Sequence, residues 1–167
     1  MMTPDSAKLM ARYNRWANQK LYRAASQLPD AEYRRNRGSF FGSIHGTFNH
    51  LLVADRIWMG RFSGIPYSVE GLDQELYPDA AELAAAWADT DTAIIAWADA
   101  LTPVSLQSEL RYTSFTARQD KRCPLGLAVL HFFNHQTHHR GQVTALLSQA
   151  GVDYGVIDLI GMEPMGA

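Results

Sequence analysis

The chain has 167 residues, of which 47% are hydrophobic and 19% charged, with a formal net charge of −2 at pH 7. This composition excludes a disordered or fibrous chain, the near-neutral charge gives no reason to expect nucleic-acid binding, and the length fits one domain over residues 1–167. Because it lacks a membrane-length apolar stretch and the apolar core of a signal peptide, and because its single cysteine, Cys123, excludes an internal disulfide, we expect a cytoplasmic protein.

The first predicted element is an amphipathic helix that begins at Thr3. The Thr3 side chain can cap a helix, and Pro4 and Asp5 are favoured residues in a first helical turn. Apolar residues then recur at helical spacing up to Pro29: Leu9, Tyr13, Trp16, Ala17, Leu21, Ala24 and Leu28. The pattern predicts one helix that buries this stripe.

Two further helices are predicted in the middle of the chain. The second helix runs from about residue 38 to Gly64, and a long loop over 65–78 follows it. Asp79 and Glu82 form a capping pattern for the third helix, which ends before Pro103. The loop between these helices is long enough to cross the length of a bundle.

A short insert separates the third helix from the last one. Residues 104–122 lose the helical period and alternate weakly, which predicts a short hairpin or an irregular segment. Pro124 restarts a helix that continues to Ala150 and ends at Gly151, and the tail after it contains too many glycines for a helix. Four long amphipathic helices with long connections predict an all-α fold, a four-helix bundle with long crossover connections.

The last predicted helix carries four of the six histidines, in the segment HFFNHQTHHR at 131–140. His135 and His139 are one helical turn apart, so both imidazoles can reach a common point beside the helix. Three further polar residues extend this seam: His131, His138 and Gln142. The seam could face solvent or hold hydrogen-bonded core histidines, but it shares its side with Ala128 and Leu146, which we expect to be buried.

A metal ion explains these histidines better than either alternative. Clustered imidazoles in a bundle core repel one another when protonated and need donors when neutral, and a metal removes both problems by accepting their lone pairs. A third ligand must then come from another helix. His50 shares its face of the second helix with Gly46 and Ala54, small residues that leave room for a cavity. His45 points about 140° away, so we interpret it as a surface or packing residue.

Three segments resemble the DinB-like, damage-inducible family: YNRWANQKL at 13–21, SIHGTFNHLLVADRIW at 43–58 and HFFNHQTHHRGQVTALL at 131–147. The similarity runs in order along nearly the whole chain, and the pattern NHxxHHRGQ at 134–142 is specific to this family. The resemblance implies a four-helix bundle with a long crossover, and family members are commonly homodimers. It also implies a metal held by the trio that the helical faces favour: His50, His135 and His139. One departure is Cys123, which stands where a Ser or Thr helix cap is usual.

The ligand set indicates what the site could do. Three imidazoles without a carboxylate favour Zn²⁺ or Ni²⁺ over Mg²⁺ or Ca²⁺. Three protein ligands leave a coordination position open for water, a thiolate or a substrate oxygen, which is typical of catalytic sites. The residues predicted to orient the ligands or to transfer protons are His131, His138 and Gln142. Arg140 and Asp55 are interpreted as a surface or inter-helix ion pair.

Three functions remain open at this stage. Relatives in the wider superfamily are thiol-dependent transferases and isomerases, so the resemblance implies a metal-dependent S-transferase that uses a low-molecular-weight thiol. The alternatives are a metal-dependent hydrolase of a small substrate and a non-catalytic metal-binding protein of the stress response. Cys123 lies some three helical turns before His135 and is not expected to be the nucleophile.

Overall fold

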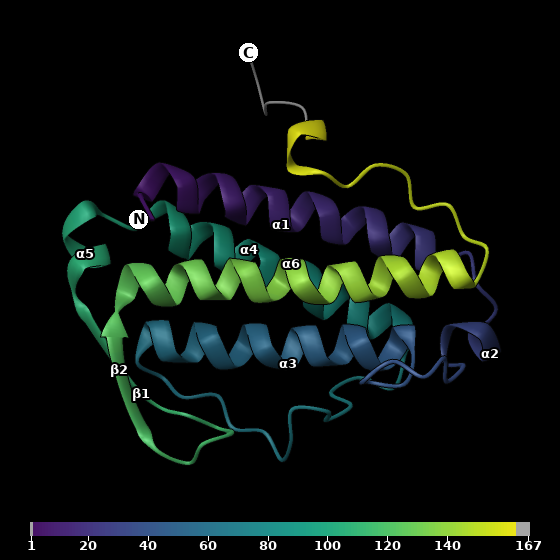
Figure 1. Cartoon of the computed structure of the whole chain (residues 1–167), viewed down its shortest axis with the longest axis horizontal. Coiled ribbons are helices and arrows are strands. Elements are labelled where there is room, and N and C mark those ends of the chain that lie inside the picture. The colour runs from purple at the N-terminus through teal and green to yellow at the C-terminus, as the bar shows by residue number, and fades with distance from the viewer. Residues whose placement is uncertain (1, 163–167) are drawn as a thin grey trace.

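Figure 1 shows the computed structural model, which describes residues 2–162. Four long helices form a bundle: α1 (Pro4–Ala25), α3 (Ile44–Ser63), α4 (Ala80–Asp99) and α6 (Leu125–Gln149). α1 and α6 run in one direction along the bundle, and α3 and α4 run in the other (Figure 1). In order around the bundle the helices are α1, α4, α3 and α6; each packs against the next, and α6 packs against α1. The predicted four-helix bundle is confirmed.

The predicted long crossover lies between α3 and α4. Because these two helices are parallel, the loop after α3 returns along the length of the bundle before α4 begins (Figure 1). Gly64 ends α3 in the left-handed conformation, with φ 73°, which glycine adopts without steric cost. Asp79 begins α4 as predicted, since its side chain accepts hydrogen bonds from the backbone N–H groups of Ala81 and Glu82.

α1 begins as predicted and buries most of the predicted stripe. The Thr3 side chain accepts a hydrogen bond of 3.1 Å from the Ser6 N–H, and the Ser6 hydroxyl accepts one from the Thr3 N–H. Leu9 was placed in the buried stripe, yet it is 46% exposed. The helix ends at Ala25, so Leu28 lies beyond it. Four residues of the predicted stripe are buried: Tyr13, Ala17, Leu21 and Ala24. Small or amide side chains extend the buried face and let α4 and α6 approach closely: Ala7, Ala11, Asn14 and Asn18.

α3 begins at Ile44, later than the sequence predicted. The short helix α2 (Asp30–Tyr33) precedes it, and residues 38–43 form a tight turn that contains a β-bridge. Glycine at both 38 and 42 has positive φ, which interrupts a helix. Ser43 then caps α3, with its hydroxyl accepting a hydrogen bond of 3.0 Å from the Gly46 N–H. The turn matters for the site because it places Phe41 over His50.

The insert before α6 contains the predicted hairpin and a helical turn that was not predicted. β1 (Glu109–Thr113) pairs antiparallel with β2 (Asp120–Pro124). Before them, α5 (Pro103–Gln107) begins at Thr102 with the same pattern of threonine, proline and serine that begins α1. Thr102 and Pro103, which the sequence analysis interpreted as the end of the third helix, therefore also begin α5. Cys123 lies in β2, and the residue at the cap of α6 is Pro124.

The core has two apolar clusters with polar residues between them along every helix. The cluster towards α2 includes Leu21, Phe48, Leu52, Trp87 and Leu147. The cluster towards the hairpin includes Ala11, Trp58, Ile94, Phe132 and Phe133. The intervening polar layer consists of Asn14, Asn18, Asp55, Asp91, Gln136 and Arg140, all buried.

The predicted irregular tail is confirmed over the part that the structure describes. Residues 152–158 have no regular structure, and a single 3₁₀ turn, η1 (Leu159–Gly161), follows them. The rest of the tail, from 163 onward, lies outside the described residues. Within residues 2–162, none of the helices combines the length and the apolar character that a membrane crossing requires.

Candidate metal centre

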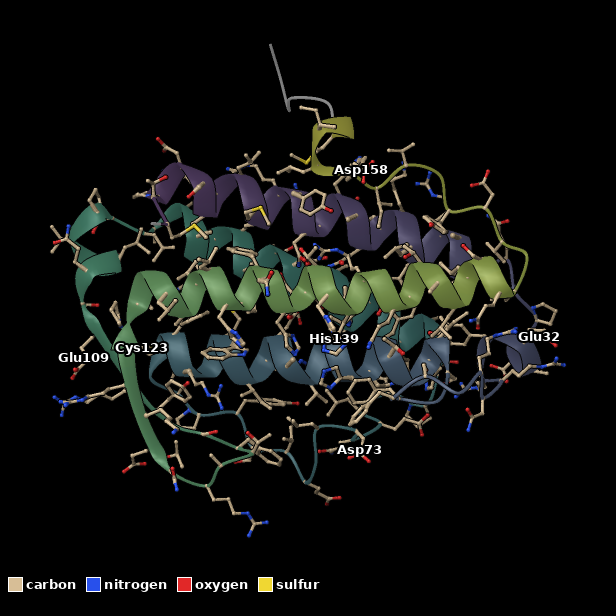
Figure 2. The ribbon with its side chains drawn as sticks, in the orientation of Figure 1. Glu32, Asp73, Glu109, Cys123, His139 and Asp158 are labelled. Carbon is tan, nitrogen blue, oxygen red and sulfur yellow. The ribbon has the colours of Figure 1, made fainter. Side chains whose placement is uncertain are left out.

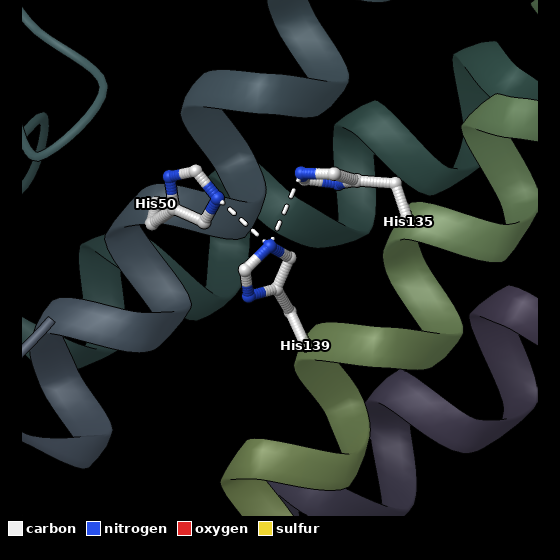
Figure 3. A group of neighbouring side chains, drawn as sticks. All are labelled: His50, His135 and His139. Atoms are coloured by element: carbon white, nitrogen blue, oxygen red, sulfur yellow. Dashed lines mark hydrogen bonds between the residues drawn. The ribbon is translucent and has the colours of Figure 1, made fainter. Parts of the chain in front are cut away.

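Three histidine side chains meet between α3 and α6. His50 projects from α3, and His135 and His139 project from successive turns of α6 (Figure 3). The Nε2 atom of His139 lies 3.2 Å from Nε2 of His50 and 3.1 Å from Nε2 of His135. One ligand atom from each of the three side chains lies within 4.8 Å of the others. The structure therefore brings together the three residues that the sequence predicted as metal ligands.

Local packing holds His50 in place. The ring of Phe41 stacks on the imidazole of His50, with 3.8 Å between ring centroids and 14° between their planes. Gly46 does not open a cavity as predicted, because the carbonyl oxygen of Phe41 occupies the space where a Cβ would sit. Ala54, the other small neighbour, does line a cavity beside the histidines.

Hydrogen bonds to Nδ1 of His50 and His139 determine which ring nitrogen carries the proton. His50 Nδ1 lies 2.7 Å from the carbonyl oxygen of Leu72, and His139 Nδ1 lies 2.7 Å from Oε1 of Gln142. Oxygen acceptors at these distances require Nδ1–H donors, so a neutral ring has its lone pair on Nε2. The Nε2 atoms of His50 and His139 thus face each other with two lone pairs and no proton between them.

Burial keeps these imidazoles neutral. It lowers the pKa of His50 to about 4, an effect that the bond to Leu72 opposes and the neighbouring His139 reinforces. Burial and four nearby imidazoles, above all His139, lower the pKa of His135 to about 3. The pKa of His139 is also lowered, mainly by burial. At pH 7 all three rings are therefore available as neutral nitrogen ligands.

The spacing of the nitrogens fits a divalent transition metal. A metal–nitrogen distance of about 2.0–2.1 Å in tetrahedral geometry separates ligand nitrogens by roughly 3.3 Å. The observed separations of 3.1 and 3.2 Å are close to this value. A cation at the centre would also accept the lone pairs that otherwise repel. The histidine cluster is therefore compatible with metal binding.

A cavity of about 280 Å³ lies beside the histidines. Its inner end is formed by His50 and His135, and its walls come from α3, the crossover and the hairpin. Residues from these three parts of the wall include Trp58, Arg61, Leu72, Tyr112 and Ser114. The sequence analysis missed the hairpin wall, because residues 112–114 approach the histidines only through tertiary packing.

Arg61 is the one cavity residue of this group that the sequence could have revealed. It follows His50 by eleven residues, so the two side chains lie within about 20° of each other around the helix. The face of His50 predicted from the sequence extends only as far as Ile57, one helical turn before Arg61.

The other three predicted site residues lie in different surroundings. His131 lines the cavity, with its ring centroid 6.0 Å from that of His135, and burial lowers its pKa. Gln142 contacts His139, as described above. His138 is exposed on α6; its ring centroid lies 4.7 Å from that of His139, but it does not line this cavity.

His45 packs inside the structure rather than at the metal site. Its Nε2 atom lies 2.6 Å from Oε1 of Glu75, and the side chain is buried. Of the two interpretations of this residue, surface or packing, the structure favours packing.

Arg140 and Asp55 do not form the predicted surface or inter-helix ion pair. Both are buried, at 2% and 1% exposure, and each bonds to an amide instead. Arg140 donates to Oδ1 of Asn14, while Asp55 accepts a bond of 2.8 Å from Gln136. They belong to the polar layer of the core, where amide groups separate the charges.

Comparison with known proteins agrees with this fold. The sequence matches the DinB family over residues 1–165. Protein DinB of Bacillus subtilis (strain 168) is 28% identical over 173 residues, which cover 91% of this chain and 93% of that protein. The crystal structure of a DinB-like protein from Bacillus cereus ATCC 10987 has the same fold, with a TM-score of 0.64 and 19% identity over 84% of this chain and 89% of that one. Because the family match spans nearly the whole chain, this protein belongs to the DinB family.

Proposed function

We propose that this protein is a metal-dependent enzyme that transfers a thiol to a small electrophilic substrate. His50, His135 and His139 bind one divalent ion per chain, Zn²⁺ or Ni²⁺ being favoured by a set of neutral imidazoles. The observation that carries the proposal is the convergence of three neutral Nε2 atoms at one end of a cavity large enough for a small molecule.

The surroundings of the histidines suit such a reaction. When bound, a divalent ion with three imidazole ligands supplies an open position that lowers the pKa of a thiol or water molecule there. Trp58 and Leu72 line the cavity and limit access of water, which strengthens electrostatic interactions inside it. Phe41 covers the outer face of the His50 ring and keeps it oriented.

His131 is placed to accept the proton of the incoming thiol. It precedes His135 by one helical turn and lines the same cavity. Burial and the nearby Arg61 lower its pKa, so the ring is neutral at pH 7 and has a free lone pair. In the transfer, the thiol sulfur forms a bond to an electrophilic carbon and the leaving group departs with its bonding electron pair. The thiol proton passes to His131 and then to solvent.

The thiol comes from outside the chain. Cys123 is the single cysteine, and it lies in the hairpin, well away from His139 in Figure 2. Burial raises the pKa of its thiol, which makes it a poorer nucleophile at pH 7. A separate low-molecular-weight thiol agrees with the resemblance to a family whose wider superfamily includes thiol-dependent transferases, and this resemblance is our reason to place transfer ahead of hydrolysis.

Metal binding is tested first, by elemental analysis of untagged protein. We expect one divalent metal ion per chain in the unmodified protein and almost none in His50→Ala. The matched control is His45→Ala, which removes a buried histidine from the same helix and should retain the metal. Circular dichroism establishes that each variant is folded. Full metal occupancy in folded His50→Ala would refute the ligand assignment.

Catalysis is tested next with a panel of cellular thiols and 1-chloro-2,4-dinitrobenzene as a model electrophile. Metal-loaded protein should release chloride and form the thioether; His135→Ala should not, and Cys123→Ser should match the unmodified protein. Turnover that persists after complete removal of the metal would contradict the proposal. Ester hydrolysis without added thiol would instead support a hydrolase, and an inactive, fully loaded protein would support a non-catalytic metal-binding role.

A further inference from the structure

We propose that Arg61 binds an anionic group of the substrate, a carboxylate or a phosphate, at the end of the cavity away from His50 and His135. The inference rests on the proposed function, because it assigns the class of small molecule that the same cavity accepts. It predicts that substrates or their thiols are acidic and carry the anion several bonds away from the reacting atom.

Arg61 lines the cavity and its guanidinium contacts two neighbouring aromatic rings. Its guanidinium carbon lies 4.4 Å from the ring centroid of Trp58 and 4.5 Å from that of Tyr112. Both rings also line the cavity, and Tyr112 belongs to the hairpin wall. The two ring centroids lie 5.4 Å apart, so both rings contact the guanidinium from the same side, and its other side is left to form hydrogen bonds.

The charge of Arg61 has no acidic partner within residues 2–162. None of their carboxylate oxygens lies within 4.0 Å of its nitrogens, whereas six other arginines have such a partner: Arg12, Arg34, Arg35, Arg37, Arg111 and Arg122. The one hydrogen bond that the Arg61 side chain makes in the described structure is a long one, 3.4 Å, to the carbonyl oxygen of Thr113. Four of its five N–H donors are therefore free for a ligand.

The lining of the cavity is cationic and contains no acid. Besides Arg61 its polar residues are imidazoles and hydroxyls, including His131, Ser114 and Thr116. Burial lowers the pKa of Arg61, which reflects the cost of holding this charge away from water. An anion inside the cavity would offset that cost, and the fork of guanidinium donors matches the oxygens of a carboxylate or phosphate.

The positions of Arg61 and His50 set the length of the ligand. Eleven residues along α3 correspond to about 16 Å between their backbones, with both side chains on one face of the helix. A long arginine side chain and an imidazole shorten this gap but do not close it. A larger cavity of about 670 Å³ shares Arg61, Tyr112 and Ser114 with the first, so an extended molecule has room there.

The first test follows the Nε–Hε signal of Arg61 by NMR in the full-length protein, with and without Zn²⁺. The signal is identified by its absence in Arg61→Gln. Acetate and inorganic phosphate are added separately at constant ionic strength, with chloride as the reference anion. We expect a saturable shift of the Arg61 signal with at least one anion, in both forms of the protein. The more effective anion identifies the group, carboxylate or phosphate.

Arg56 is the internal control for this titration. It lies on the same helix and also stacks on aromatic rings, but it donates to the hydroxyls of Tyr67 and Tyr77. Its signal should not shift. Equal shifts of both signals, no saturable shift, or a shift of Arg61 that requires Zn²⁺ would overturn the inference.

The second test measures ligand length and charge together. Mercaptocarboxylates of increasing chain length and uncharged 2-mercaptoethanol are titrated into Co²⁺-loaded protein, whose visible absorption reports ligand entry. At least one longer mercaptocarboxylate should bind about tenfold more tightly than 2-mercaptoethanol, a typical gain for one charge-assisted contact. Arg61→Gln should reduce that ratio about tenfold, Arg61→Lys should retain part of it, and Arg56→Gln should leave it unchanged.

An unchanged ratio in Arg61→Gln would refute the role of Arg61. If no thiol entered the Co²⁺-loaded protein at all, the proposed thiol transfer would be wrong. The NMR titration would still decide whether Arg61 binds an anion. Failure of the inference is therefore distinguishable from failure of the proposed function.

Discussion

Hydrogen bonds behind the imidazoles control how the histidines present their nitrogens. The Leu72 carbonyl holds His50, and the Gln142 side chain holds His139, each by accepting the Nδ1 proton. Bonds of this kind fix the ring orientation and direct the Nε2 lone pair, and their loss typically weakens metal binding 10–100-fold.

Replacement of Gln142 tests this orientation directly. Gln142→Leu keeps the size of the side chain but cannot accept the Nδ1 proton, so we expect Zn²⁺ affinity to fall by about 10–100-fold. The measurement is a competition titration against a chelator of known affinity. Gln149→Leu, at the exposed end of the same helix, is the control and should bind Zn²⁺ normally. Equal affinities in the two variants would show that Gln142 does not orient His139.

The polar layer should make the stability of the protein depend on pH, through Asp91. Burial raises the pKa of Asp91 to about 6, although the amides of Asn18 and Asn14 and the charge of Arg140 act in the opposite direction. The ordinary pKa of an aspartate in an unfolded chain is about 3.9. A pKa raised on folding stabilises the protein fully below about pH 3.9, and the contribution is lost as the pH rises to about 6.

Asp91→Asn removes this pH dependence. Between pH 4.5 and 7, its free energy of unfolding relative to the unmodified protein should increase by about 2 kcal/mol. Urea denaturation at the two pH values, with chelator present throughout, gives this difference. Any cost of the lost hydrogen bonds that does not depend on pH cancels in the comparison. A relative stability that is the same at both pH values would contradict the raised pKa.

At the scale of elements, two glycines inside helices differ in the space around them. A Cβ at Gly46 would collide with the backbone of the 38–43 turn, whereas a Cβ at Gly141 meets no atom of the described structure within 4 Å. The turn carries Phe41, which stacks on His50. The absence of a side chain at Gly46 therefore lets the turn approach α3 and hold Phe41 against His50. Gly141 has no such role.

Alanine substitutions separate these roles. Gly46→Ala should destabilise the protein by about 1–3 kcal/mol and weaken metal binding, because the turn must move away from α3. Gly141→Ala should stabilise it by about 0.5–1 kcal/mol, because alanine favours a helix interior more than glycine does. Thermal or denaturant unfolding measures both changes. A stabilised Gly46→Ala variant would show that the close approach of the turn is not required.

For the molecule as a whole, we expect the bundle to be stable without metal. Its two apolar clusters lie at both ends of the bundle and do not depend on the histidines. Addition of a chelator should leave the helical circular dichroism unchanged and lower the melting temperature, because metal binding stabilises only the folded form. Loss of helical signal on chelation would place this protein with zinc fingers, which fold only around their metal.

A homodimer is a second proposal for the whole molecule. It rests on the resemblance to the family, whose members are commonly dimers. We expect light scattering at micromolar concentration to give about twice the mass of the 18.7 kDa chain. A single-chain mass under these conditions would exclude the dimer.

The sequence by itself determined where the long helices form and which histidines lie on the same side of a helix. The capping residues Thr3 and Asp79 predicted helix starts because a cap depends only on its own first turn. The one-turn spacing of His135 and His139 placed both rings on one side of α6, since helical geometry is local. The same reasoning fails at Leu9, where periodicity cannot tell which apolar stripe the neighbouring helices will cover.

Tertiary structure decided what surrounds the histidines. The sequence predicts a surface or inter-helix ion pair of Asp55 and Arg140 instead of a buried polar layer. Each helix contributes only one or two polar residues to this layer, which exists only after the four helices pack together. The hairpin wall with Tyr112 is distant in sequence from His50 and approaches it through packing of the insert. Contacts between residues far apart in sequence follow from how whole elements pack, so neither propensity nor spacing reveals the cavity, the contact of Tyr112 with Arg61, or the layer of buried charge.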